Sequence, residues 1–195
     1  MKLEYLLLLA YILVFTVCAI SPYDRAVWWA ENIPVILIVA FLVLTYPRFQ
    51  FSALSYLFMT VFIVLHTIGG HYTFERVPFD WITDSFGFSR NHYDRIAHFS
   101  VGFYAYPIAE FMLRQNLISK KIPLLLFAVF SIVTVAAGYE LIEWQYAIYA
   151  DAEQGIAMLG SQGDVWDAQK DILADTLGAI FILFWFRFKK REFNS

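Results

Sequence analysis

Six long apolar stretches constrain the fold of this chain more than any other feature of its sequence. A helix that crosses a bilayer needs about 20 mostly apolar residues, and 60% of the 195 residues are hydrophobic while 16% are charged. The mean hydropathy of +0.58 also sets the chain apart from ordinary soluble domains. We therefore expect an all-α, polytopic membrane protein. The predicted six-transmembrane-helix bundle forms a single integral membrane domain over residues 1–195, with spans at Leu3 to Ile20, Ile33 to Tyr46, Phe51 to Gly70, Asp94 to Leu113, Ile122 to Tyr149 and Asp171 to Phe188.

The first apolar stretch also has some features of a secretory signal peptide, since Lys2 precedes a run of leucines. The apolar run continues for about 18 residues, however, and no small-x-small cleavage site closes it. We therefore interpret it as the first membrane helix. The single cysteine, Cys18, lies inside this span and has no second cysteine with which to form an internal disulfide.

Lysine and arginine residues orient the predicted bundle. Basic residues accumulate on the cytoplasmic side of bacterial membrane proteins. With the N-terminus inside, nine of the fourteen basic residues fall on the inner side: Lys2, Arg48, Arg114, Lys120, Lys121, Arg187, Lys189, Lys190 and Arg191. Six spans place both termini on one side, and both ends carry positive charge. We expect a multi-pass protein of the bacterial inner membrane with both termini cytoplasmic.

Acidic residues show the opposite distribution. Of seventeen acids, Glu4, Glu110 and Glu192 fall on the predicted inner side, and the other fourteen lie at or beyond the outer helix ends. An ionised side chain at the bilayer centre costs about 2.5 to 3.5 kcal/mol on insertion scales, so such residues are usually retained for function or pairing. The acids inside the predicted helices are therefore candidate functional residues.

The third and fourth predicted helices bring histidine and carboxylate to this outer layer. His66 lies near the outer end of the third helix, and His71 follows a Gly69-Gly70 pair that is expected to end it. Asp94 and His98 are four residues apart, which places both on one face of the fourth helix, about one turn in from its outer boundary.

The fifth and sixth predicted helices add carboxylates at the same depth. Glu140 and Glu143 are three residues apart on one face, and Glu140 lies about 27 Å along the helix from Ile122. The stretch GDVWDAQKDILADTLGA then spaces its acids by three, four and four residues, which confines them to an arc of about 80° if the whole stretch is helical. These acids are Asp164, Asp167, Asp171 and Asp175.

This concentration of carboxylates predicts a bound cation. Packed carboxylates repel one another unless protons, cationic side chains or a metal neutralise them, and Arg90, Arg95 and Lys170 are the cations nearby. Imidazole and carboxylate ligands without thiolate suit zinc, manganese or iron, among which the sequence does not distinguish. We expect a divalent metal ion, with Glu140 or Glu143 as the catalytic proton-transfer base and with ligands drawn from His66, His71, Asp94, His98, Asp164, Asp167, Asp171 and Asp175.

Structural roles remain open for several of these residues. His66 is also compatible with a hydrogen-bonded interhelical residue, and Asp94 with a helix N-cap. Glu140 and Glu143 are compatible with polar groups at headgroup level. Asp164 and Asp167 are compatible with a solvated face, whereas Asp171 and Asp175 lie deeper against apolar sequence. The loop of residues 71–93 mixes aromatic and charged side chains, and we interpret it as an interfacial cap over the site, with a flexible loop as the alternative.

Two sequence blocks carry a resemblance to known families. The blocks YDRIAHFSVGFYAY and YELIEWQYA followed by DVWDAQKDILADTLGA resemble the YjdF-type bacterial inner-membrane proteins, a family of unknown function, over nearly the whole chain. The C-terminal half is also similar to the wider VanZ-like group, whose polar positions correspond here to Asp94, His98 and Phe99, to Glu143 and Gln145, and to Asp171, Asp175 and Gly178. VanZ-like chains usually have an asparagine where Asp175 stands, and an arginine shortly before this second acidic block. The resemblance implies which residues matter rather than a particular reaction.

Three functions are compatible with this sequence. The first is a metal-dependent hydrolase in which the ion activates water for attack on a lipid-linked ester or phosphate. The second is a proton- or cation-coupled carrier, which would need polar residues through the inner half of the spans, where the fifth and sixth are apolar. The third is a non-enzymatic membrane scaffold. The expected partners are membrane lipids, including a lipid-linked substrate, and no nucleic acid, while the oligomeric state is left open.

Overall fold

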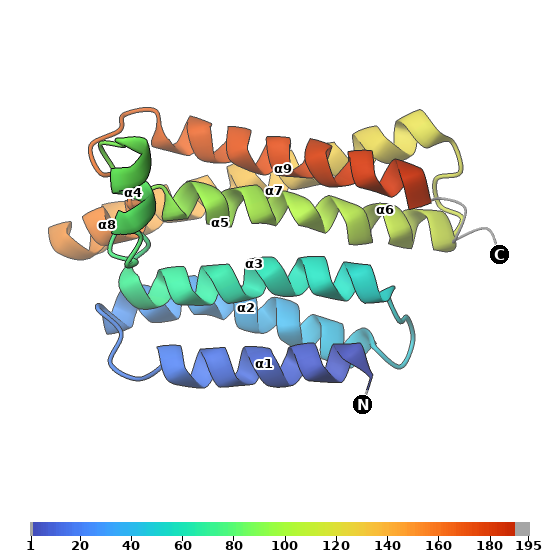
Figure 1. Ribbon diagram of the computed structural model, residues 1–195, viewed down its shortest axis with the longest axis horizontal. Coiled ribbons are helices and arrows are strands. Elements are labelled where there is room, and N and C mark those ends of the chain that lie inside the picture. Colours follow the sequence, from blue (N-terminus) through green and yellow to red (C-terminus); the bar gives the residue numbers. More distant parts are fainter. Residues whose placement is uncertain (1, 190–195) are drawn as a thin grey trace.

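The computed structural model describes residues 2–189, with side chains up to residue 185. Within these residues the chain forms helices joined by short loops and no strand, so the predicted all-α fold is confirmed (Figure 1). The elements are α1 (Leu3–Cys18), α2 (Arg25–Thr45), α3 (Ala53–Tyr72), α4 (Asp80–Phe86), α5 (Tyr93–Val101), the 3₁₀ helix η1 (Gly102–Tyr104), α6 (Ala105–Arg114), α7 (Lys121–Tyr149), α8 (Ala152–Leu159) and α9 (Asp167–Lys189).

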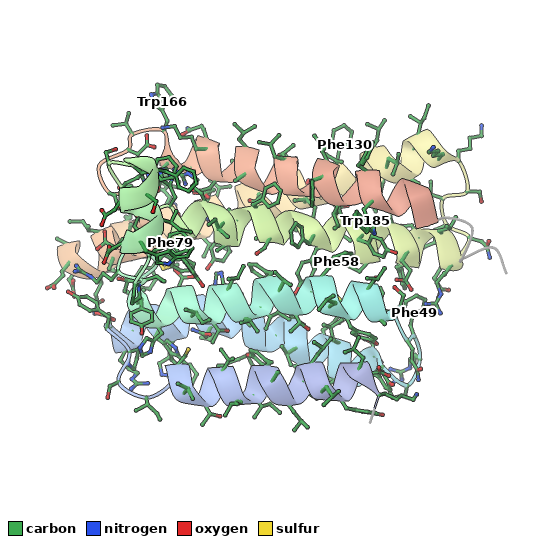
Figure 2. All side chains as sticks on the ribbon, in the orientation of Figure 1. Phe49, Phe58, Phe79, Phe130, Trp166 and Trp185 are labelled. Atoms are coloured by element: carbon green, nitrogen blue, oxygen red, sulfur yellow. The ribbon has the colours of Figure 1, made fainter. Side chains whose placement is uncertain are left out.

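Three of the described helices, α2, α3 and α7, are long and apolar enough to cross a membrane, and α1 is a shorter apolar helix. The outward faces of the bundle are apolar as well, with Leu13, Phe41 and Phe130 each more than 60% exposed. Figure 2 shows Phe130 and Trp166 projecting away from the bundle. A helical protein with so apolar an outer surface suits a lipid environment, because an aqueous one would leave large hydrophobic patches in water.

The long helices pack side by side as two groups that share α3. In the first group α1 and α2 pack against α3, around a core of Tyr11, Val35 and Ile63. In the second, α5, η1, α6, α7 and α9 pack together, and their apolar core contains Tyr106, Ile132 and Leu183. Helix α3 also packs against α5 and so joins the two groups.

A break in the fourth predicted span separates α5 from α6. Pro107 has no backbone N–H to donate to the carbonyl of Phe103, and the chain forms the 3₁₀ helix η1 just before it. Gly102 in η1 lies directly against Gly178 of α9, and a side chain at either glycine would collide with the opposite backbone. This close approach of α5 and η1 to α9 is the small-residue packing typical of membrane helices. It holds α5, which carries Asp94 and His98, against α9, which carries Asp171 and Asp175.

The polar end of the bundle carries the short helices. Helices α4 and α8 lie at the end where α9 begins, while the start of α1 and the end of α9 lie at the opposite end (Figure 1). Basic residues assigned to the inner side, such as Arg48, Arg114 and Lys121, lie at helix boundaries of that opposite end. The side chains of Arg187 and Lys189 are not described, and Lys190, Arg191 and Glu192 lie outside the described residues.

Several predicted helix boundaries were wrong. Helix α2 begins at Arg25 rather than near Ile33, because Asp24 caps it by accepting hydrogen bonds from the backbone N–H groups of Ala26 and Val27. Helix α3 continues through both glycines to Tyr72. A Cβ at Gly69 would collide with the Phe74 ring, so this glycine allows the following turn to fold back rather than ending the helix.

Two further differences concern the acidic end. Helix α9 begins at Asp167, so Asp164 precedes it rather than continuing the helical stripe. The segment of residues 71–93, predicted as a loop, contains the two-turn helix α4. The cap of α5 is His92 rather than Asp94, which lies inside the first turn of α5.

Candidate metal centre

His98 lies at the centre of a buried group of carboxylates between α5 and α9. Its Nδ1 is 3.3 Å from Oδ2 of Asp175. Its Nε2 lies 3.6 Å from Oδ1 of Asp94 and 3.7 Å from Oδ1 of Asp171. The i,i+4 spacings of Asp94 with His98 and of Asp171 with Asp175 bring these four side chains onto the two facing helix surfaces.

The three side chains on the Nε2 side have a spacing that a metal ion can bridge. One ligand atom from each of Asp94, His98 and Asp171 lies within 4.8 Å of the other two. Among the His, Cys, Asp and Glu side chains of the described residues, this is the group of three that meets this spacing. Asp94, Asp171 and Asp175 are each less than 10% exposed. Oδ1 of Asp175 is buried and finds no hydrogen-bond partner among the described groups, so this carboxylate retains an unused acceptor.

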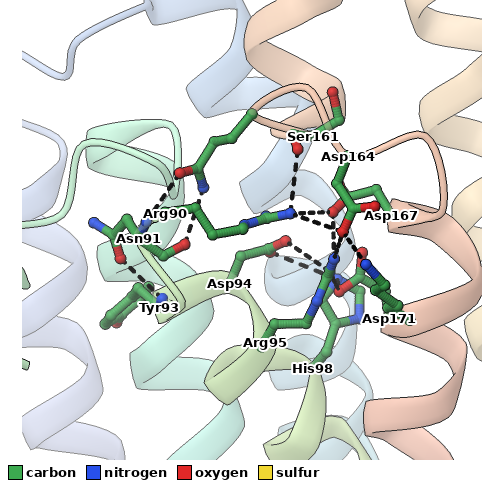
Figure 3. A network of polar contacts seen from close by, with 12 residues as sticks. Arg90, Asn91, Tyr93, Asp94, Arg95, His98, Ser161, Asp164, Asp167 and Asp171 are labelled. Carbon is green, nitrogen blue, oxygen red and sulfur yellow. Dashed lines mark hydrogen bonds and ion pairs between the residues drawn. The ribbon is translucent and has the colours of Figure 1, made fainter. Parts of the chain in front are cut away.

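A layer of basic side chains covers the outer side of this group (Figure 3). Arg95 donates hydrogen bonds to both Asp167 and Asp171, and Arg90 Nη1 lies 2.7 Å from Oδ1 of Asp167. Lys170 lies 2.6 Å from Oδ2 of Asp164, and this hydrogen bond lowers the pKa of the Asp164 carboxyl. Asp164 and Asp167 are therefore paired mainly with cationic side chains.

Two loops are joined above the basic layer. The backbone N–H of Asn91 donates to the side-chain oxygen of Gln162 at 3.0 Å, and the Gln162 amide donates back to the Asn91 carbonyl at 3.0 Å. The side-chain amide of Asn91 also donates to the carbonyls of Glu75 and Val77. These contacts tie the loop before α5 to the loop before α9 and so hold Arg90 over the carboxylates.

A second polar group that the sequence analysis missed lies on α2, α3 and α7. Glu31 is 1% exposed, and its Oε2 lies 3.1 Å from Nε2 of His66 and 2.5 Å from the hydroxyl of Tyr139, which donates to it. His66 thus pairs with Glu31 rather than with His98. Glu31 was missed because the second span was predicted to start at Ile33, which placed Glu31 in a loop. Tyr139 was missed because its side chain is neutral, whereas the candidate residues were histidines and acids.

Glu143 lies between the two polar groups. It is 9% exposed and interacts electrostatically with both Glu31 and His98. Glu140, one turn earlier on α7, is half-buried and interacts with His98 and Asp171. Its Oε1 is buried without a hydrogen-bond partner among the described residues. Both predicted proton-transfer residues therefore belong to the same polar layer as His98.

His71 occupies a different place. Its Nδ1 lies 2.8 Å from the carbonyl oxygen of Cys18, and its own carbonyl accepts a hydrogen bond from the backbone of Tyr23. The structure thus uses His71 to tie the α1–α2 loop to the end of α3, and does not bring it to the carboxylates around His98.

The layer as a whole has an excess of acidic groups. Three permanent cations, Arg90, Arg95 and Lys170, accompany eight carboxylates, so an excess of three negative charges remains even with both His66 and His98 protonated. The carboxylates are Glu31, Asp94, Glu140, Glu143, Asp164, Asp167, Asp171 and Asp175. Burial of such an excess is unfavourable, and protons or a bound cation would relieve it.

A cavity of about 330 Å³ opens beside these groups. Its polar end is lined by His66, Asp94, His98, Glu143 and Asp175, and the remainder by apolar side chains of α2, α5, α6 and α7. Sites for small molecules typically combine a mostly apolar cavity with a few convergent polar groups. The cavity therefore offers a ligand direct access to the His98 group.

The sequence matches one family along almost its full length. The family described as "Predicted membrane protein (DUF2238)" matches residues 3–192. The chain is 33% identical over 189 residues to the inner membrane protein YjdF of Escherichia coli, which covers 95% of this chain and 89% of the relative. No significant match was found among solved structures. These matches confirm the expected inner-membrane location.

Proposed function

This chain belongs to the DUF2238 family of predicted membrane proteins, and from the geometry of its His98 group we propose that it is an inner-membrane, metal-dependent hydrolase with its metal site in the outer leaflet. The substrate would carry an ester or phosphate bond on a lipid. The observation that carries this proposal is the position of His98, which contacts Asp175 through one ring nitrogen and directs the other toward Asp94 and Asp171.

That arrangement matches the way proteins prepare a histidine for a metal. A ligating histidine usually donates its second ring N–H to a carboxylate, which fixes the tautomer and the ring orientation. Asp175 would take this orienting role, and Asp94, Asp171 and Nε2 of His98 would bind the ion. The geometry thus favours an orienting role for Asp175 over the direct ligation expected from sequence.

The ligand types limit the choice of ion. One imidazole and two carboxylates suit zinc, manganese or iron, and the single cysteine contacts none of these residues in the described structure. Three protein ligands leave coordination positions for water and substrate, as in catalytic zinc sites. Asp164 and Asp167 would balance Arg90 and Arg95 rather than bind the ion.

The proposed chemistry is hydrolysis by an activated water. A divalent ion held by Asp94, His98 and Asp171 would supply an activated water, and the oxygen of that water would attack the phosphorus or acyl carbon of the substrate. Glu143, which lines the same cavity as His98, would accept the proton of this water and pass it to the departing oxygen, so that ester and water become acid and alcohol. Glu140, which interacts electrostatically with His98, is the second candidate for this proton transfer.

The proposed topology has six spans with both termini in the cytoplasm. Besides α2, α3 and α7, the spans would be α1, the α5–η1–α6 unit and α9. It is tested in a Cys18→Ala background by labelling single cysteines with a membrane-impermeant maleimide in intact cells. We expect Val165→Cys to react from outside and Leu117→Cys to react only after lysis, since both positions are exposed. The reverse pattern would refute the orientation.

Metal content is the direct test of the site. Detergent-purified wild type should hold stoichiometric metal by elemental analysis, and His98→Ala should lose it. The control is His71→Ala, because His71 is a histidine outside the group and should leave the metal in place. Absence of metal from the wild type after loading with zinc, manganese or iron would argue for a structural role of the acids instead.

A carrier is the less supported alternative. Transport would need a polar path from the His98 layer to the opposite end, where Glu110 is buried. Between these two levels lies an apolar cluster that includes Ala105, Ile132 and Leu183. Uptake of radioactive manganese into proteoliposomes would support the carrier over the hydrolase.

A further inference from the structure

We infer that the cavity beside His98 binds one acyl chain of an outer-leaflet lipid and presents the headgroup of that lipid to the carboxylate layer. The inference rests on the proposed function for the role of the headgroup end. The binding of the chain rests on the shape and lining of the cavity alone.

The cavity is amphipathic along its length. At one end it is lined by Asp94, His98 and Glu143, and away from them by apolar side chains such as Val35, Ile38 and Ile132. A ligand that matches both ends has a polar group joined to a hydrocarbon chain. A volume of about 330 Å³ lies at the lower end of the roughly 300 to 1,000 Å³ typical of small-molecule sites, which suits one chain rather than a whole phospholipid.

The cavity also opens toward the surface that faces lipid. Val135 of α7 lines the cavity and is 61% exposed on the outer surface of the bundle. Ile38 and Ile108, which also line the cavity, are only half-buried. A hydrocarbon chain can therefore enter from the bilayer between α2 and α7, without passing through water.

A second apolar groove continues the path along the bundle. This groove of about 770 Å³ shares Ile38, Tyr104 and Ile108 with the cavity and extends toward Arg48 and Gln115 at the inner end. The combined surface therefore runs from the carboxylate layer toward the inner leaflet. In the proposed orientation an outer-leaflet lipid has this same direction, with its headgroup outward and its chain inward.

The experiment is photo-crosslinking with a lipid probe. Purified protein in phosphatidylcholine nanodiscs receives a phosphatidylglycerol that carries a diazirine midway along one acyl chain, and adducts are located by mass spectrometry. We expect adducts on Val35 and Ile132, which line the cavity and are at most 2% exposed. Adducts confined to exposed residues such as Phe130, which bulk lipid also reaches, would overturn the inference.

A cavity-filling variant provides the matched comparison. Ala136 is buried and lines the cavity, so Ala136→Phe should reduce the adducts on Val35 and Ile132 several-fold and leave those on Phe130 unchanged. Ala137→Phe makes the same change at the next position of α7, outside the cavity lining, and should label as wild type does. If Ala136→Phe fails to fold, Ala97→Leu adds a smaller bulk to another wall. Equal labelling of Val35 and Ile132 in the filled variant and the wild type would refute chain binding.

Failure of this inference can be separated from failure of the hydrolase proposal. Labelling of Val35 and Ile132 in the His98→Ala variant, or in wild type that holds no metal, supports the cavity independently of the ion. If the protein binds metal stoichiometrically but Val35 and Ile132 are not labelled, the proposed metal site is supported and binding of an acyl chain in the cavity is refuted.

Discussion

His98 and Asp175 are joined by a contact of 3.3 Å between Nδ1 and Oδ2, and this contact turns the other ring nitrogen of His98 toward Asp94 and Asp171. Asp175 is 1% exposed, and its second oxygen has no hydrogen-bond partner in the described structure. A carboxylate this deeply buried is costly to maintain. Its contact with His98 is the structural reason for assigning it a role in orientation.

The first prediction concerns the charge of Asp175. Asp175→Asn retains the size of the side chain but removes the charge that favours a fixed His98 tautomer. We expect manganese or zinc binding to weaken by about 10- to 100-fold, the range found for carboxylates that orient ligating histidines, as measured by isothermal titration. The matched control is Asp151→Asn, since Asp151 is the N-cap of α8 and asparagine caps helices equally well. Unchanged affinity in Asp175→Asn would remove the orienting role.

The second prediction concerns competition between Arg95 and the ion. Arg95 donates to Asp171 and lies 3.7 Å from Oδ2 of Asp94, so it shares two carboxylates with the proposed metal. Arg95→Gln should lower the free energy of unfolding of the metal-free protein by about 3 to 5 kcal/mol, as for other broken buried pairs. The same variant should bind manganese more tightly, because Asp171 loses its competing cation.

Thermal unfolding in detergent with and without manganese measures both effects. The control is Arg76→Gln, because Arg76 pairs with Glu75 at the surface, where such pairs contribute about 0 to 1 kcal/mol. If manganese stabilises Arg95→Gln less than it stabilises the wild type, Arg95 supports the metal site rather than competing with it.

The sequence could predict the layer of charged groups because helical spacing carries that information. Asp94 and His98 are four residues apart, as are Asp171 and Asp175, and helix geometry alone places each pair on one face. The expected inner-membrane location followed in the same way from apolar length and basic residues. Helical periodicity does not show which side chain on another helix each charged group contacts.

The errors of prediction had local physical causes. Because α3 does not end at its glycines, His66 and His71 lie five residues apart on one helix, about 140° around its axis at 100° per residue, and they contact different neighbours. With Asp24 as its N-cap, α2 begins at Arg25, eight residues before the Ile33 assumed as the start of the second span, so Glu31 lies inside the helix. The pairing of His66 with Glu31 was therefore not predicted, because the start of α2 is set by the N-cap Asp24 and hydropathy does not detect N-caps.

The third prediction concerns the end of the bundle opposite the His98 group, where Glu110 is fully buried. Its carboxylate accepts hydrogen bonds from the backbone and hydroxyl of Ser52, from the hydroxyl of Ser55 and from Arg114. Glu110→Ala leaves buried donors without an acceptor, at about 1 to 3 kcal/mol for each. The free energy of unfolding in detergent should fall accordingly, while metal content should not change.

Glu153→Ala is the control for this change, because Glu153 is exposed in the first turn of α8 and should leave stability nearly as in wild type. Loss of metal from Glu110→Ala in a folded protein would contradict the assignment of a structural role to Glu110 and of metal binding to the acids around His98.

The last prediction concerns the contact between Gly102 and Gly178. A Cβ at Gly178 would collide with the carbonyl of Phe99, so Gly178→Ala must push α9 away from α5. Overpacking of this kind costs about 1 to 3 kcal/mol. Because Phe99 follows His98 directly and Asp175 lies three residues before Gly178, the same displacement should separate His98 from Asp175 and reduce metal content.

Gly138 offers a matched control on α7. A Cβ at this position meets nothing within 4 Å, and alanine is favoured over glycine in a helix interior by up to about 1 kcal/mol. Gly138→Ala should therefore unfold at the wild-type temperature or slightly above and keep its metal, whereas Gly178→Ala should unfold at a lower temperature with less metal bound. If both variants behave alike, close backbone contact between α5 and α9 does not position the His98 group.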